Sequence, residues 1–338
     1  MKPQDRPPRD SGRASMARQD NPYGMLEFLY WYHAWNNNHY PSRSSVDRSV
    51  ELMKKCGVGI VRMDFLWQDI EPVRAKHSFS KYDYLVDALT RSNIAILGVL
   101  GYHADWASPG KIWNVPHTDF TFFYDYCSAV ARRYKDRVKF WEIWNEPDSR
   151  VYWQPQDGLV EYARLLRGAY SLLKQIDPAC SVLNGGLSEG LASVRALYER
   201  GAGDCFDIMN IHAFESPVHR DAIDRVVAFV KATGQVMDLN NDAAKRIWVT
   251  ETGCPGVKAG SSAADSWLGE NPSELQQASW VTQVYSEVLA LDRVDKVFWA
   301  FFRDTDNHWK DGTDYLGLVR NDFSLKPAYR AYREIAAI

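Results

Sequence analysis

The sequence predicts a single (β/α)8 barrel, or TIM barrel, over residues 23–338. Short apolar runs rich in β-branched and aromatic residues alternate with segments of helical period along this whole range. Strands that alternate with helices form a parallel sheet, and eight such units in a chain of 338 residues close most naturally as a barrel. An open, doubly wound sheet is the main structural alternative. Residues 1–22, rich in Arg, Asp, Pro and Ser, are expected to form a flexible tail.

In the first half of the chain, each apolar run is followed by a segment whose apolar residues recur at helical spacing. Around 45–56, Val46, Val50 and Met53 share one face, and Gly57 is placed to end the helix. The same spacing indicates helices around 84–89 and 123–131. The four strands of this half are predicted at 25–32, 60–65, 94–100 and 138–143.

The second half repeats the pattern. A helix is expected to end at Asp177, because the following Pro178 disfavours helical backbone at the residue before it. Further helices are expected around 220–233 and 274–291. The strands are predicted at 181–183, 206–211, 247–250 and 294–301.

Composition excludes several classes of function. The net charge of -3 and pI near 6.3 give no basic field that would hold nucleic acid or anionic lipid. No apolar run approaches the ~20 residues that cross a bilayer, and residues 1–22 lack the apolar core of a signal peptide. The chain as written is therefore expected to be cytoplasmic, or secreted if its N-terminus was truncated or replaced.

Neither a metal nor another cofactor is expected. The five cysteines are widely spaced and contain no C-x-x-C pair, so they are predicted to be mostly buried thiols. No H-E-x-x-H or comparable cluster occurs. The expected partner is a neutral carbohydrate, since the chain is rich in aromatic side chains that can stack on sugar rings.

Polar and aromatic side chains follow nearly every predicted strand. In a barrel, functional groups lie at the C-terminal strand ends. Ordinary turns favour Gly, Asn, Asp, Ser and Pro, so an enrichment in Trp, His, Glu and Arg predicts a site at this mouth. These residues include Arg62, Asp64, His103, Trp106, Asn145, Glu146, His212, Glu251 and Trp299.

Two glutamates end the fourth and seventh predicted strands, which lie opposite each other in a barrel. Glu146 belongs to the segment W-E-I-W-N-E-P-D at 141–148, and Glu251 follows the apolar run 247–250. Hydrolysis of a glycosidic bond uses such a pair, and a carboxyl separation of ~5–5.5 Å gives a retaining mechanism. Repulsion between the two charges keeps one acid protonated. We predict Glu146 as acid/base, Glu251 as nucleophile, and Asn145 as a partner of the sugar 2-hydroxyl.

The segment W-E-I-W-N-E-P-D resembles the fourth-strand motif of clan A glycoside hydrolases, particularly family 39 and the related bacterial endoglycosidases. The resemblance extends over most of the chain after Tyr23. It implies that Arg62 supports the nucleophile, that His212 holds the nucleophile or the sugar, and that His103 belongs to the site. It also implies that Trp299 forms a platform beneath the reacting sugar.

The predicted function is hydrolysis of a β-linked oligo- or polysaccharide by double displacement. Many tryptophans lie in predicted loops, where they could stack on sugar faces along an open cleft. Trp106 is one of them. This distribution favours cleavage inside a chain rather than at its end.

Two other functions remain open. Gly186-Leu187-Ser188-Glu189-Gly190 matches the G-x-S-x-G nucleophile elbow of serine hydrolases, although no H-G-G-G-type oxyanion loop occurs upstream. The match equally fits an ordinary loop after the fifth strand. A catalytically silent carbohydrate-binding barrel would also keep the aromatic residues, but it would not need both glutamates.

Overall fold

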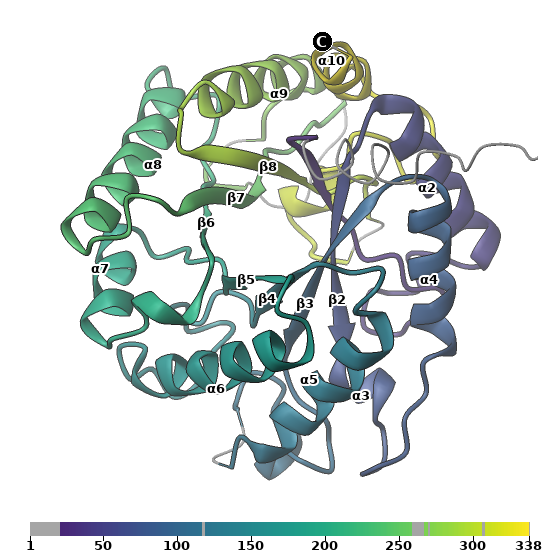
Figure 1. Ribbon diagram of the computed structural model, residues 1–338. Helices are drawn as coiled ribbons and strands as arrows, with labels where there is room; N and C mark the ends of the chain where they lie inside the picture. Colours follow the sequence, from purple (N-terminus) through teal and green to yellow (C-terminus); the bar gives the residue numbers. More distant parts are fainter. Residues whose placement is uncertain (1–20, 117–118, 259–266, 270, 306–307, 338) are drawn as a thin grey trace, which may run out of the picture.

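A closed barrel of eight parallel strands forms the centre of the computed structural model, which describes residues 21–116, 119–258, 267–269, 271–305 and 308–337. The strands follow one another in sequence order, and β8 pairs with β1 to close the sheet. Figure 1 shows the helices as a ring around the strands. The predicted (β/α)8 barrel is confirmed, and the open sheet is excluded. The predicted tail lies outside the described residues, apart from Asn21 and Pro22.

The strands are β1 (Tyr23–Leu26), β2 (Ile60–Leu66), β3 (Ala95–Gly101), β4 (Phe140–Ile143), β5 (Ser181–Asn184), β6 (Ile208–His212), β7 (Arg246–Thr252) and β8 (Val294–Ala300). The α-helices are α2 (Arg43–Cys56), α3 (Trp67–Ile70), α4 (Ser80–Arg91), α5 (Thr121–Tyr134), α6 (Val160–Ile176), α7 (Leu191–Glu199), α8 (Ala222–Leu239), α9 (Glu274–Leu289) and α10 (Pro327–Ala336). None of the described helices is long and apolar enough to cross a membrane.

Local sequence explains the helix ends. The Ser42 side chain accepts a hydrogen bond from the Ser45 backbone at the start of α2, and Ser273 does the same with Gln276 at the start of α9. Gly57 ends α2 with φ 91, a left-handed conformation that suits glycine. These residues fix where α2 and α9 begin and where α2 ends.

The core has two layers, because strand residues point alternately into the barrel and towards the helices. Ile60, Leu97, Leu183, Trp248 and Phe298 belong to the cluster inside the barrel. A larger cluster fills the space between strands and helices. The five cysteines are buried and unpaired, as predicted.

The first strand is shorter and begins earlier than predicted. β1 ends at Leu26, whereas the prediction ran from 25 to 32. The buried carboxylate of Glu27 accepts hydrogen bonds from the backbone N–H groups of Phe28, Phe302 and Arg303. These bonds tie the end of β1 to the chain after β8, so the following residues leave the sheet.

Candidate active site

Arg62 lies at the centre of the barrel mouth. Ile60 faces the barrel interior, so alternation along β2 also directs Arg62 and Asp64 inward. Arg62 is 2% exposed. Its guanidinium donates to both Glu142 oxygens at 2.7 and 2.8 Å, to Glu251 Oε1 at 2.6 Å and to Asn145 Oδ1 at 2.7 Å. One buried cation thus connects β2 with the ends of β4 and β7.

The end of β4 has unusual backbone geometry. Trp144 and Glu146 have φ 69 and φ 43, backbone values that residues other than glycine rarely adopt. Such outliers gather at functional sites, where the surrounding structure holds them in place. The Trp144 ring is buried and donates through Nε1 to the Tyr152 carbonyl at 2.9 Å. This anchoring positions the Glu146 side chain over the barrel mouth.

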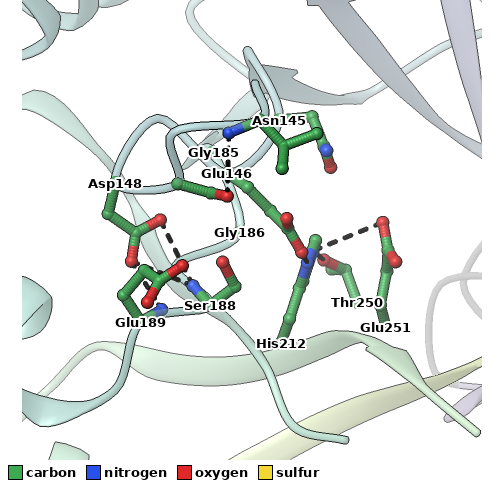
Figure 2. A network of polar contacts seen from close by, with 12 residues as sticks. Asn145, Glu146, Asp148, Gly185, Gly186, Ser188, Glu189, His212, Thr250 and Glu251 are labelled. Carbon is green, nitrogen blue, oxygen red and sulfur yellow. Dashed lines mark hydrogen bonds and ion pairs between the residues drawn. The ribbon is translucent and has the colours of Figure 1, made fainter. Parts of the chain in front are cut away.

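His212 lies between the two glutamates. Figure 2 shows the imidazole with Glu146 on one side and Glu251 on the other. Nδ1 lies 2.7 Å from Glu146 Oε1, and Nε2 lies 3.7 Å from Glu251 Oε1. Ligand-type atoms of all three side chains lie within 4.8 Å of one another. The two predicted acids, Glu146 and Glu251, therefore lie on either side of the same imidazole ring.

A register shift in the sheet brings two consecutive residues of β7 to His212. Ile211 pairs with Val249 and His212 with Glu251, so Thr250 is an extra residue between them. Such bulges re-aim side chains beside active sites. Here Thr250 Oγ1 lies 3.1 Å from His212 Nε2, while Glu251 reaches the same ring.

Hydrogen bonds behind His212 determine which ring nitrogen carries a proton. The Asn210 amide NH2 group donates to the Asn184 carbonyl, so its Oδ1 faces Thr250 and accepts from that hydroxyl at 2.6 Å. The Thr250 hydroxyl has only one proton to donate. Its oxygen must therefore accept from Nε2–H of His212. Nδ1 is left to share a proton with Glu146.

The glycine-rich loop after β5 has a structural explanation. A Cβ on Gly186 would lie 1.9 Å from His212 Nε2, so only glycine leaves room for the ring. The backbone N–H groups of Ser188 and Glu189 donate to the Asp148 carboxylate. No hydrogen bond to the Ser188 hydroxyl from a histidine occurs in the part of the chain that the structure describes. The loop therefore lacks the base that a serine nucleophile needs.

Burial and charge act in opposite directions on the central groups. Burial lowers the pKa of His212, but the Glu251 charge and the contact with Glu146 raise it, and the net direction is upward. Burial raises the pKa of Glu251, while the charges of His212 and Arg62 oppose that effect. The charge of His212 acts on Glu251 and the charge of Glu251 acts on His212, so the protonation of each depends on the other.

The three side chains Glu146, His212 and Glu251 have the atoms of a possible cation site. Both ring nitrogens of His212 are already hydrogen bonded, and the Arg62 guanidinium occupies one side of Glu251. A cation would have to displace these contacts. Hydrogen bonds to His212 and the ion pair between Arg62 and Glu251 already occupy these ligand atoms.

Residues 111–332, more than half of the chain, match the family model described as the glycosyl hydrolase catalytic core. The chain belongs to this glycosyl hydrolase family. The model for cellulase, glycosyl hydrolase family 5, matches residues 23–186.

Relatives with solved structures confirm the predicted likeness to clan A, close to family 39. A family 39 glycoside hydrolase from Bacteroides cellulosilyticus WH2 superposes with a TM-score of 0.76 at 22% identity, over 95% of this chain and 64% of that one. Xylanase 10B from Thermotoga petrophila RKU-1 gives a TM-score of 0.67 at 17% identity, over 100% and 99%. At these identities the likeness is one of fold.

Among curated proteins, the chloroplastic beta-glucosidase-like SFR2 of Oryza sativa subsp. japonica is 25% identical over 130 residues. The match covers 34% of this chain and 20% of the rice protein. The chain thus spans about a fifth of the length of the curated relatives that it matches.

His103 and Trp106, the predicted site residues after the third strand, contact residues other than Glu146 and Glu251. His103 Nε2 lies 3.1 Å from Asp105 Oδ1. Trp106 donates through Nε1 to the Glu71 carbonyl at 2.7 Å, and its ring packs edge-on against Trp67. Their roles in substrate binding stay predictions.

The prediction for Trp299 is wrong. Phe298 and Ala300 face the barrel interior, so Trp299 points towards the helices. Its exposure is 0%, and Nε1 donates to the Leu316 carbonyl at 2.8 Å. A ring in this position packs in the outer core and cannot form a platform beneath a sugar.

Three residues of the site were not among the predicted site residues. Glu142 binds Arg62 with both oxygens and accepts from Gly186 N–H at 3.1 Å. Thr250 and Asn210 complete the hydrogen bonds behind His212. Each is a polar residue that directly follows at least two apolar residues in a predicted strand, a signal that could have identified it.

Proposed function

We propose that this glycoside hydrolase acts by the retaining mechanism, with Glu251 as nucleophile and Glu146 as acid/base. The observation that carries the proposal is the approach of the two carboxylates, whose oxygens come within 4.8 Å. Retaining enzymes hold their acids ~5–5.5 Å apart, whereas inverting enzymes need about 6.5–9.5 Å to admit a water molecule. The short separation favours direct attack on the sugar.

The nucleophile is assigned to Glu251 because Arg62 donates to it at 2.6 Å. A guanidinium stabilises the ionised carboxylate, and only that form can attack the anomeric carbon. Arg62 is itself held by the two oxygens of Glu142. Its direction is therefore fixed before substrate binds.

The acid/base role of Glu146 rests on its contact with His212 Nδ1 at 2.7 Å. Because Nε2–H donates to the Thr250 hydroxyl, a further proton lies between Nδ1 and Glu146. In the first step, Glu251 forms a bond to the anomeric carbon, the glycosidic bond breaks, and the proton on Glu146 passes to the leaving oxygen. In the second, Glu146 takes a proton from water, which attacks the same carbon and releases Glu251.

Asn145 is assigned to the sugar 2-hydroxyl. Its Oδ1 accepts from Arg62 at 2.7 Å, which leaves the amide NH2 group to face a ligand. A hydrogen bond at the 2-hydroxyl strengthens in the transition state. Asn145 thus connects the sugar 2-hydroxyl to the Arg62 guanidinium, which also binds Glu251.

We further propose a β-linked oligo- or polysaccharide as substrate, cleaved internally, with residues 23–338 as one catalytic domain. The relatives named as xylanase and beta-glucosidase-like support a β-linkage. Trp35 and Trp113, on the loops after β1 and β3, are 47% and 42% exposed. Exposed rings on separate loops offer stacking surfaces for more than one sugar. The presence of both acids disfavours a silent binding barrel.

Proton NMR of the first product tests the mechanism. Two successive displacements invert the anomeric carbon twice, so the first product formed from a β-glycoside should be the β-anomer. An α-anomer at early times contradicts the retaining mechanism. Product lengths from a panel of β-linked oligosaccharides test internal cleavage, which gives fragments longer than one sugar unit.

A further inference from the structure

Asp64 carries a carboxylate that the mechanism does not use. It lies on β2, two residues beyond Arg62, and alternation directs it into the barrel mouth. Its exposure is 4%. No donor among the described residues makes a hydrogen bond to its side chain, since the one side-chain bond to Asp64 is from the Tyr30 hydroxyl to its backbone carbonyl.

Asp64 is not the ion-pair partner of Arg62. The hydrogen bonds of the guanidinium go to Glu142, Glu251 and Asn145. Burial raises the pKa of Asp64 to about 7, although the nearby Arg62 charge acts against this. A buried carboxylate without donors is costly to a folded protein. Where such a group persists at a site, a ligand that brings the donors explains it.

We propose that the Asp64 carboxylate accepts hydrogen bonds from hydroxyl groups of the sugar that is attacked, and that it selects a neutral sugar over a uronic acid. The inference rests on the proposed function and deepens it. Sugar hydroxyls are strong donors to a carboxylate. A uronic acid would bring a second negative charge into a space with little water, where like charges repel strongly.

The groups around Asp64 indicate which sugar it contacts. The charges that act on it are those of Arg62, Glu142 and Glu251, and the Arg62 guanidinium donates to both of these glutamates. Burial raises the pKa of the Tyr102 phenol, and the charges of Asp64 and Glu251 both add to this effect. The sugar whose anomeric carbon Glu251 attacks therefore lies beside Asp64. The leaving group lies on the side of Glu146.

Removal of single hydroxyls from the substrate tests the contact. The probes are aryl glycosides of the parent sugar that the wild-type protein hydrolyses, each lacking one hydroxyl. Asp64→Asn should lower kcat/KM for the parent about 10- to 100-fold, the usual effect of losing hydrogen bonds to a charged group. For the analogue that lacks the contacted hydroxyl, the variant should differ from wild type by less than about threefold.

Asp295→Asn is the matched control. Asp295 pairs with Arg246 at 2.7 Å at the start of β8, at the opposite end of the barrel from the site. This variant should keep the wild-type kcat/KM on every analogue. Thermal melts of both variants separate binding effects from unfolding. If Asp64→Asn costs the same factor on all deoxy analogues, or nothing on the parent, the proposal is overturned.

A uronic acid glycoside tests the selection. The wild-type ratio of kcat/KM for the parent over its uronic acid should be large, and Asp64→Asn should reduce it at least about tenfold. A wild-type protein that prefers the uronic acid would contradict the proposal.

Failure of the proposed function gives a different result. If wild type hydrolyses no aryl glycoside, the retaining mechanism fails, and Asp64 is tested by calorimetry with cellobiose and xylobiose. Weaker binding by Asp64→Asn supports the contact. Binding that is absent or equal in the two proteins overturns it.

Discussion

The Nδ1 atom of His212 lies 2.7 Å from Glu146 Oε1, and its Nε2 atom lies 3.1 Å from the Thr250 hydroxyl. Because the Thr250 hydroxyl donates to Asn210 Oδ1 at 2.6 Å, its oxygen accepts a hydrogen bond from His212 Nε2–H. The proton that the proposed acid role of Glu146 requires is therefore held at Nδ1 or on Glu146 itself. Thr250 and Asn210 thus determine which nitrogen of His212 is available to Glu146.

Thr250→Val should lower kcat/KM about 10- to 100-fold, because a valine of the same shape cannot accept the Nε2 proton. Without that acceptor, the charged form of His212 is less stable. The basic limb of the pH profile should therefore move to lower pH. The measurement is kcat/KM against pH, together with a thermal melt.

Thr233→Val provides the control for this change. Thr233 is fully buried in α8, and its hydroxyl has no hydrogen-bond partner among the residues that the structure describes. Replacing an unpaired buried hydroxyl by a methyl group should leave both activity and pH profile unchanged. An equal shift of the pH profile in Thr233→Val, or none in Thr250→Val, contradicts the role assigned to Thr250.

Gly186→Ala should reduce activity strongly in a protein that still folds. The new methyl group would lie 1.9 Å from His212 Nε2, and a rigid ring can only move away from it. Movement of the ring breaks its contacts with Glu146 and Thr250. Gly234→Ala in α8 is the control, because its nearest neighbour lies 3.5 Å away. This control should be active and slightly more stable, by up to about 1 kcal/mol. Equal activity in the two variants contradicts the packing argument.

Asp64→Asn should stabilise the protein at pH 8 more than at pH 4. The folded pKa of Asp64 is raised by burial to about 7, above the value of about 3.9 in an unfolded chain. Folded wild type thus binds a proton between these values, and its stability falls as pH rises from 4 to 7. The variant lacks this loss, which is at most about 4 kcal/mol. Denaturant unfolding across this range measures it, and a constant difference would contradict burial of the charge.

Trp299→Phe should keep kcat/KM within about threefold of wild type while lowering stability, because it loses one buried hydrogen bond and some packing. Trp299→Ala should destabilise the protein by about 3–5 kcal/mol. Both effects follow from a ring in the outer core. Assays well below the melting temperature separate folding from catalysis. A Trp299→Phe variant that is folded but inactive would show that Trp299 contributes to catalysis.

The sequence predicted the position of a residue correctly where a polar residue follows an apolar strand. It did not do so where apolar residues continue through the strand end. Glu146 and Glu251 each follow an apolar run, so their place at the mouth could be predicted. Trp299 lies in a run that is buried on both faces, where alternation cannot tell the interior from the helix side. The predicted face was therefore wrong.

The hydrogen bonds behind His212 could not be predicted in the same way. They require the register between β6 and β7, including the shift that makes Thr250 an extra residue. Register depends on contacts between segments 38 and 40 residues apart, which no local pattern records. The sequence predicted where the two glutamates lie, and the structure was needed to show the hydrogen bonds around His212.

The two glutamates should respond differently to removal. Glu251→Ala should abolish turnover of every substrate, since no covalent intermediate can form without a nucleophile. Glu146→Ala should still react with a dinitrophenyl glycoside, because this leaving group departs without a proton, and should then stall for want of a base. A burst of dinitrophenolate followed by slow turnover is expected.

Azide decides the assignment, because it attacks the intermediate without a base. With Glu146→Ala it should restore the second step and yield a β-glycosyl azide from a β-glycoside, since the second displacement returns the original configuration. With Glu251→Ala, any azide product should have the α configuration, formed by one direct displacement. If Glu146→Ala is folded but equally inactive on activated and unactivated substrates, and azide changes nothing, Glu146 is not the acid/base. If azide gives the α product with Glu146→Ala and the β product with Glu251→Ala, the two roles must be exchanged.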